Sequence, residues 1–356
     1  MNRAEIDELQ RELSNTLSRT ALSRKRLNLA RAICYGGALI WFAAIILLQV
    51  YLYGGGDVSF LYTIDPEASF FERYKALIFV APLFILILIG GVGLGIFYNK
   101  FDEEERIIVR RVVRKLFPEA SLSLEPFELP ASLMERSNFF GCIRRQELSG
   151  YSLGSIRFET DARAIIFRDI IVNFGKSRRI LAQSGVGSIV IILKMMLKGL
   201  FGNRIENAAA DFRGLFADAK LERSVSASVV ILPDALERRL DYLAAAIQSL
   251  RNVNGNKLVK LEDPEFERRF AVYADDEIAA RYILTPAMMQ RITELHDRFR
   301  REVMLSFSGD KFYFATSMPG GFLTLGQSRQ ASGESLANLY ENINAARSIL
   351  GDLKLR

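Results

Sequence analysis

Two long uncharged segments, residues 33–53 and 76–98, restrict what this chain can fold into more than any other feature. The first has 21 residues, which form an α-helix of about 31 Å, and the hydrocarbon core of a bilayer is about 30 Å thick. The second has 23 residues and is richer in Ile, Leu and Phe. Joined by the polar stretch 54–75, they predict a transmembrane hairpin with that stretch as its external loop.

The basic residues near these segments predict the orientation of the hairpin. Lys and Arg close to a span stay on the cytoplasmic side of the membrane. Only Arg73 and Lys75 lie between the two spans. Eleven basic residues flank the hairpin: Arg19, Arg24, Lys25, Arg26, Arg31, Lys100, Arg106, Arg110, Arg111, Arg114 and Lys115. We therefore expect both termini, and the large region after the second span, to be cytoplasmic.

The second span carries a pair of small residues, Gly91 and Gly95, in a GxxxG spacing. Such a face lets two helices approach closely, so it suits packing against the first span or, in a homo-oligomer, against another copy of the chain. Neither span contains an ionisable Asp, Glu, Lys, Arg or His. That composition argues against a proton relay or an ion pathway, which need polar groups inside the membrane.

The segments on either side of the hairpin have helical patterns. Residues 1–32 place Ile6, Leu9, Leu13 and Leu17 at helical spacing, which predicts an amphipathic helix. Its narrow apolar stripe suits a short coiled coil or packing against the region after the second span. Residues 99–130 predict a juxtamembrane helix up to Phe117, limited by Pro118, and then a linker at 121–130 that contains two prolines.

Residues 131–356 predict a cytoplasmic α+β domain with mostly antiparallel strands and amphipathic helices. Period-two patterns indicate strands, and Gly309 with Asp310 forms a hairpin turn between two of them. The expected strands are 152–160, 163–172, 212–221, 224–232, 257–261, 270–274, 302–307 and 311–316. The expected helices are 234–250, 287–298 and 336–350.

An apolar run at 185–201 interrupts the strand pattern and has three interpretations. As a third span it is unfavourable, because two lysines at mid-helix cost roughly 5 to 7 kcal/mol on the insertion scale. It also suits a core helix whose lysines reach the solvent, or a helix that lies in the headgroup plane. In the last case the basic residues would contact anionic lipid headgroups: Lys176, Arg178, Arg179, Lys194, Lys198 and Arg204.

Few residues suggest chemistry. The carboxylates of Asp275, Asp276 and Glu277 are adjacent, so they suit a helix N-terminus better than a cation site. His296, the only histidine, has no catalytic or metal-binding partner beside it and is expected at the solvated surface. The two cysteines make no metal pair, and no phosphate loop or nucleophile motif is present, so we expect no cofactor and no metal. The net charge of +6 lies partly beside the spans, which favours lipid over nucleic acid.

Two stretches resemble a known type of protein. They are KLEDPEFERRFAVYADDEIAARYILTPAMM, residues 260–289, and DFRGLFADAKL, residues 211–221. They resemble an uncharacterised bacterial membrane family, a domain of unknown function, in which two spans precede a soluble domain. The resemblance implies a protein of the bacterial inner membrane and transfers no catalytic residue.

Two functions are expected from these patterns. The first is a membrane-anchored cytoplasmic interaction or scaffold domain that binds a protein partner or an anionic lipid surface. The alternative is a membrane-bound enzyme whose site is assembled from scattered polar residues, which would appear as a buried cluster of perturbed carboxylates in the fold.

Overall fold

A computed structural model describes residues 75–140, 148–160, 163–174, 212–233, 257–299, 301–325 and 333–353, and scattered helical positions between 8 and 47. For residues 75–89 it describes the backbone alone. The chain divides into two compact units. The sheet unit comprises Met1–Leu17, Glu105–Arg179 and Glu206–Arg356. The helical unit comprises Ser18–Glu104 and Ile180–Ile205.

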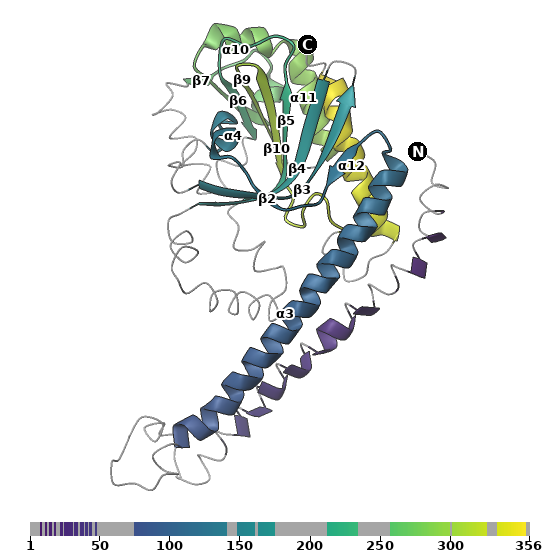
Figure 1. Ribbon diagram of the computed structural model, residues 1–356. Coiled ribbons are helices and arrows are strands. Elements are labelled where there is room, and N and C mark those ends of the chain that lie inside the picture. Colours follow the sequence, from purple (N-terminus) through teal and green to yellow (C-terminus); the bar gives the residue numbers. More distant parts are fainter. Residues whose placement is uncertain are drawn as a thin grey trace. The chain divides into compact units, whose positions relative to one another are not determined.

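The sheet unit is built on a 10-stranded sheet in the order β1-β3-β4-β5-β10-β9-β6-β8-β7, with β2 also paired to β3 (Figure 1). All of its recorded strand pairs are antiparallel, which confirms the expected α+β class. The strands are β1 (Ser121–Ser123), β2 (Phe127–Glu128), β3 (Leu148–Thr160), β4 (Arg163–Phe174), β5 (Phe212–Lys220), β6 (Val229–Pro233), β7 (Lys257–Val259), β8 (Phe270–Ala274), β9 (Val303–Ser308) and β10 (Lys311–Ser317).

The helices are α3 (Lys75–Leu116), α4 (Ala131–Arg136), α9 (Pro264–Glu267), α10 (Glu277–Ile283), α11 (Pro286–Phe299) and α12 (Gly333–Leu353). Together with the end of α3, α11 and α12 cover one face of the sheet, and α4 lies on the other (Figure 1). Both faces of the central strands are therefore buried. In β5, for example, Leu215 and Ala217 face the helices, while Phe212 and Phe216 pack on the opposite side with Tyr313.

Local signals account for most element boundaries. Asp276 ends the extended backbone after β8, and its carboxylate accepts hydrogen bonds from the N–H groups of Ile278 and Ala279, so it is the N-cap of α10. Thr285 accepts from the N–H of Met288, and Pro286 begins α11. Gly309, at φ 59°, lies in the two-residue turn between β9 and β10. These findings confirm the helix N-terminus expected at Asp275–Glu277 and the predicted hairpin turn.

The segment expected to be a linker, within 99–130, instead contributes two short strands. Ser121–Ser123 and Phe127–Glu128 both pair with β3. Leu124 and Leu129 are buried. The two prolines lie on either side of β2 rather than within it, so they do not interrupt its pairing. The expected helix at 234–250 lies outside the described residues.

The N-terminal segment and the two predicted spans were also expected to be helical. The Lys115 ammonium, near the end of α3, pairs with the carboxylate of Glu12 at 2.6 Å, while the apolar stripe expected to pack there or in a coiled coil lies outside the described residues. Within the described part of the chain, no helix is both long enough and apolar enough to cross a membrane.

Candidate functional site

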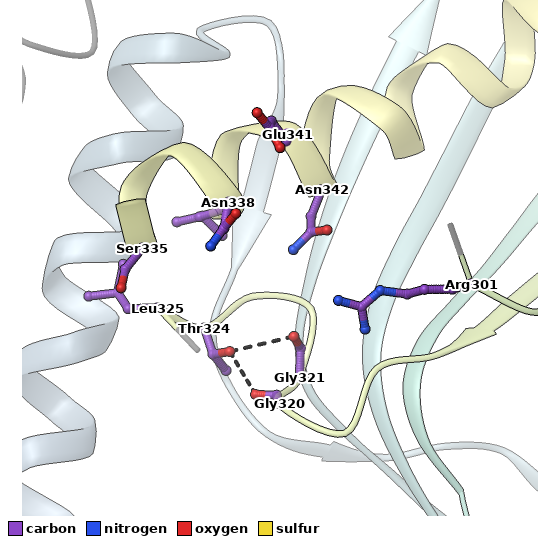
Figure 2. A pocket seen from close by; sticks show the side chains of 10 residues that line it. Arg301, Gly320, Gly321, Thr324, Leu325, Ser335, Asn338, Glu341 and Asn342 are labelled. Carbon is purple, nitrogen blue, oxygen red and sulfur yellow. Dashed lines mark hydrogen bonds between the residues drawn. The ribbon is translucent and has the colours of Figure 1, made fainter. Parts of the chain in front are cut away.

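A polar pocket of about 320 Å³ opens between the loop that follows β10, the N-terminal half of α12 and the segment before β9. Gly320 and Gly321 supply backbone to its wall, and Leu325 and Leu339 supply apolar contact. The polar side chains that line it come from all three segments (Figure 2): Arg301, Thr324, Ser335, Asn338, Glu341 and Asn342.

The loop from Met318 to Leu325 is held by backbone hydrogen bonds at both ends. The N–H of Met318 donates to the carbonyl of Arg213 on β5 at 2.9 Å, and the N–H of Leu325 donates to the Glu105 carboxylate at 2.5 Å. Inside the loop, the Thr324 hydroxyl donates to the carbonyl of Gly320 at 2.8 Å (Figure 2). The pocket wall is therefore a fixed turn.

A buried ion pair lies beneath this loop. Asp169 on β4 and Arg213 on β5 have side chains that are 2% and 5% exposed. The guanidinium uses both terminal nitrogens on the carboxylate, with Nη2 at 2.9 Å from Oδ2, and Nη1 also donates to the carbonyl of Ile170 at 3.0 Å. Asp169 Oδ2 in turn accepts from the N–H of Leu323 at 3.3 Å. The pair thus ties the loop to two central strands.

Gly321 is the point at which the loop meets the ion pair. Its φ of 91° lies in the left-handed region, which L side chains rarely adopt. A Cβ atom at this position would lie 2.4 Å from Nη2 of Arg213 and 3.1 Å from Oδ2 of Asp169. Only glycine fits here without displacing the buried charges.

Helix α12 presents its two faces to different surroundings. Leu336, Leu339, Ile343 and Ala346 follow helical spacing and are buried against the sheet. Figure 2 shows the side chains of Asn338 and Asn342, one turn apart, directed toward Thr324 and Arg301, whereas Glu341 points away from them.

Four polar pocket residues differ from polar residues of the nearby helices in their hydrogen bonds and ion pairs. Arg347 of α12 pairs with Glu119 at 3.1 Å, and Arg298 of α11 donates to the Ser348 hydroxyl at 2.6 Å. By contrast, the part of the chain that the structure describes supplies no hydrogen bond or ion pair to the side chains of four pocket residues: Arg301, Asn338, Glu341 and Asn342.

A second feature is an exposed apolar cluster, called here the α10–β7 patch. It consists of Leu258 on β7 and of Ile278 and Tyr282 on α10, whose exposed fractions are 47%, 77% and 86%. The two elements are adjacent, because the Arg281 guanidinium donates to the carbonyl of Lys260 at 2.9 Å. Ile278 and Tyr282 are four residues apart and therefore share one helix face.

A further buried charge cluster lies on the other face of the sheet. Asp218 on β5 accepts from Arg168 on β4 and from Lys311 on β10, the latter at 3.1 Å. Burial, together with the nearby Asp218 carboxylate, raises the pKa of Tyr313 to about 12. Each buried aspartate is thus matched by a guanidinium, which is a structural arrangement.

The residues that suggested chemistry have structural partners. Asp275 accepts from the N–H of Ser228 at 2.8 Å, Asp276 caps α10, and Glu277 pairs with Arg281 at 2.9 Å. Among the described residues, no group of three or more His, Cys, Asp or Glu side chains is arranged to hold a metal ion.

His296 was expected at the solvated surface, and the structure leaves it only partly exposed. Its side chain is 28% exposed, and its ring packs edge-on against Phe270 with centroids 5.5 Å apart. The aromatic contact arises because β8 lies beside α11, which the sequence pattern did not disclose. Asp297, hydrogen-bonded by Arg269 and by His296, has its pKa held below the usual range.

The described structure does not test the predicted lipid-contact site. The candidate lipid contacts lie outside the described residues: Lys176, Arg178, Arg179, Lys194, Lys198 and Arg204. Gly91 and Gly95 are buried in α3. Their neighbour Gly90 faces Cys34 so closely that an added Cβ would lie 2.3 Å from its Sγ.

Sequence reasoning did not identify the pocket. Two signals were present: the MPGGF sequence at 318–322, which favours a tight turn, and charges inside otherwise apolar strands, among them Asp169 and Arg213. Neither signal identifies Arg301 or Asn342, which reach the pocket from other elements.

Comparisons with known proteins address the family. No curated protein and no solved structure matches this chain. Two stretches resemble an uncharacterised family. Residues 211–221 form β5, and residues 260–289 include α9, β8, α10 and the start of α11. Both stretches fall inside one matched region. Residues 210–355 match the model of a family described as "Protein of unknown function (DUF3137)", which confirms the resemblance to an uncharacterised family over that part of the chain.

Proposed function

We propose that this protein is a membrane-anchored interaction domain, which binds a protein partner through the α10–β7 patch. In this proposal the segments 33–53 and 76–98 form the transmembrane hairpin of a bacterial inner-membrane protein, with both termini cytoplasmic. The support for the anchor is the apolar length of the two segments and the concentration of basic residues outside them. Buried Gly91 and Gly95 suit close helix packing, within one chain or between two copies.

The exposure of the patch is the single observation that carries the binding function. Leu258, Ile278 and Tyr282 leave large apolar side chains in solvent on a unit whose central strands bury theirs on both faces. Leaving such side chains exposed forgoes about 1.5 to 3 kcal/mol for each one that a partner would bury. A clustered set of this kind marks an interaction site more often than scattered single residues do.

The surrounding charges favour a protein partner over an anionic lipid surface. The patch is bordered by the carboxylates of Glu262, Asp275, Asp276 and Glu277 and by the basic side chains of Lys257, Lys260 and Arg281. A rim of both signs around an apolar centre is typical of protein interfaces. Anionic headgroups are attracted by an excess of basic residues, which this rim lacks. The expected partner therefore presents an apolar side-chain cluster with charges of both signs.

Site-specific photo-crosslinking in native membranes tests the patch. A photoreactive residue at position 282 of the full-length protein is expected to give a discrete protein adduct, and Ile278→Glu is expected to abolish it. Tyr151, an aromatic side chain that is 46% exposed on β3, is the matched control and should give no adduct. Adducts of equal yield at both positions, or adducts only with lipid, would contradict the proposal.

Reporter fusions test the anchor separately. Fusions after Tyr62 and after Arg356 should report opposite compartments, outside and inside, because the basic residues flank the hairpin and not its loop. The same compartment for both fusions would remove the hairpin from the proposal.

A further inference from the structure

The polar pocket behind the Met318–Leu325 loop has the properties of a binding site for a small molecule. Its volume of about 320 Å³ falls within the range of about 300 to 1,000 Å³ that small-molecule sites occupy. Its wall is held in place by the buried Asp169–Arg213 pair, so the site exists before a ligand arrives. Preformed sites lose less conformational entropy when they bind.

The cation of this pocket, Arg301, sets the charge of the ligand. The described residues provide no carboxylate partner for its guanidinium, which Figure 2 shows directed toward Asn342. A guanidinium offers a planar fork of donors that matches a carboxylate or a phosphate group. Because Glu341 points away from the other polar groups, the inner surface favours one negative charge on the ligand.

The neutral polar groups of the pocket suit hydroxyl groups on the ligand. Asn338 and Asn342 each offer an amide that both donates and accepts, and their spacing of four residues places them side by side on α12. The carbonyl oxygens of Gly320 and Gly321 lie on the opposite wall, where each accepts from the Thr324 hydroxyl and keeps a second lone pair for a ligand. Neutral amides and carbonyls pair best with hydroxyl groups, which also donate and accept.

We propose that this pocket binds a small hydroxylated oxyanion, with its phosphate or carboxylate group on the Arg301 guanidinium and its hydroxyl groups on Asn338 and Asn342. Such a group reaches the pocket in one of two forms, as a free polyol phosphate or as a glycerophosphate lipid headgroup. The site uses none of the residues of the α10–β7 patch, so it stands independently of the proposed protein interaction.

Binding measurements on the full-length protein in detergent test the soluble form of the ligand. Glycerol 3-phosphate is the probe, and neutral glycerol is the control that lacks the anion. Saturable binding of glycerol 3-phosphate, measured by calorimetry, is expected. Arg301→Gln should weaken it about tenfold or more, because one charge-assisted hydrogen bond contributes about 1.5 to 3 kcal/mol.

Vesicle binding tests the lipid form. The protein is reconstituted in phosphatidylcholine nanodiscs without detergent. Its binding to phosphatidylglycerol vesicles is then compared with its binding to phosphatidylcholine vesicles. If the headgroup is the ligand, phosphatidylglycerol binding falls in Arg301→Gln and the free probe binds weakly. If the free phosphate is the ligand, only glycerol 3-phosphate responds to the substitution. Either result supports the proposal and identifies the source.

Two variants keep the test specific. Asn342→Ala removes a predicted hydroxyl contact and should weaken binding about threefold to tenfold, in line with a neutral hydrogen bond of about 1 kcal/mol. Arg298→Gln is the matched control, because Arg298 is also exposed near the end of α11 but donates to Ser348. The proposal is overturned if neither form binds, if glycerol binds as well as its phosphate, or if Arg298→Gln weakens binding as much as Arg301→Gln.

Discussion

The Met318–Leu325 loop separates two groups of polar side chains that differ in how they are matched. Beneath it, the Asp169 carboxylate is paired with both terminal nitrogens of Arg213 and with the N–H of Leu323. On its other side, Arg301 and Asn342 face a pocket without a partner among the described residues. Buried charges must be matched or they destabilise the fold, whereas solvated ones need no partner. The matched side therefore holds the structure, and the unmatched side is open to a ligand.

The largest expected effect comes from breaking the matched pair. Asp169→Ala leaves the Arg213 guanidinium buried without its carboxylate and releases Leu323. We expect the free energy of unfolding of the full-length protein to fall by about 3 to 5 kcal/mol. Denaturant unfolding, followed by far-ultraviolet circular dichroism, measures this loss. A loss below about 1 kcal/mol, the scale of an exposed pair, would show that the pair is not buried in solution.

Gly321→Ala is expected to cost about 3 kcal/mol, as the sum of backbone strain and contact with the buried pair. Gly309→Ala is the matched control, since its φ of 59° is also left-handed but nothing lies within 4 Å of its added Cβ. The control should therefore lose only the strain, about 1 to 2 kcal/mol. Equal losses in the two variants, measured by denaturant unfolding, would mean that the loop does not rest on the ion pair.

Alkaline titration examines the second matched cluster, at Tyr313 and Asp218. The pKa of Tyr313 is raised from 10.0 to about 12, so the unfolded chain deprotonates first as the pH rises. The contribution of this group is fully present below pH 10 and is lost as the pH rises toward 12, by at most about 3 kcal/mol. Tyr313→Phe should remove that part of the pH dependence, measured as unfolding free energy between pH 9 and 12. Tyr151→Phe, at an exposed position, should leave it unchanged.

The smallest effect is expected on the unmatched side. Arg301→Gln and Asn342→Ala break no contact with the described residues, so each should change the unfolding free energy by less than about 0.5 kcal/mol. Thermal and denaturant melts of the full-length variants measure it. A loss of more than about 1 kcal/mol would show that these side chains support the fold, which would remove the contrast between the two sides of the loop.

Sequence patterns predicted the local structure of the sheet unit closely. Strand β8 occupies the predicted residues 270–274, and helix α11 extends the predicted range 287–298 by one residue at each end. These elements follow from period-two and helical spacing, and their caps at Asp276 and Pro286 follow from local hydrogen bonding. The linker predicted before Pro130 is replaced by two short strands, and local backbone propensity does not account for the difference. Its strands form because β3 offers an edge with which they pair.

The pocket could not be predicted in the same way, because its parts come from distant elements. Arg301 precedes β9, the glycines follow β10, and the asparagines belong to α12. Their meeting depends on the strand order, in which β10 lies between β5 and β9. A sequence pattern fixes which way a side chain points from its own strand or helix, but it contains no information about which strand becomes the neighbour.

By itself, therefore, the sequence determined the α+β class, the hairpin turn at Gly309, the helix caps and the resemblance to an uncharacterised family. Only the tertiary structure decided that Asp169 meets Arg213, that Gly321 rests on that pair, and that Arg301 and Asn342 face one cavity. The physical reason is the distance along the sequence over which each interaction acts. Backbone propensity and capping act within a few residues, whereas the neutralisation of a buried charge depends on a partner 44 positions away, which only the register of β4 and β5 brings into contact.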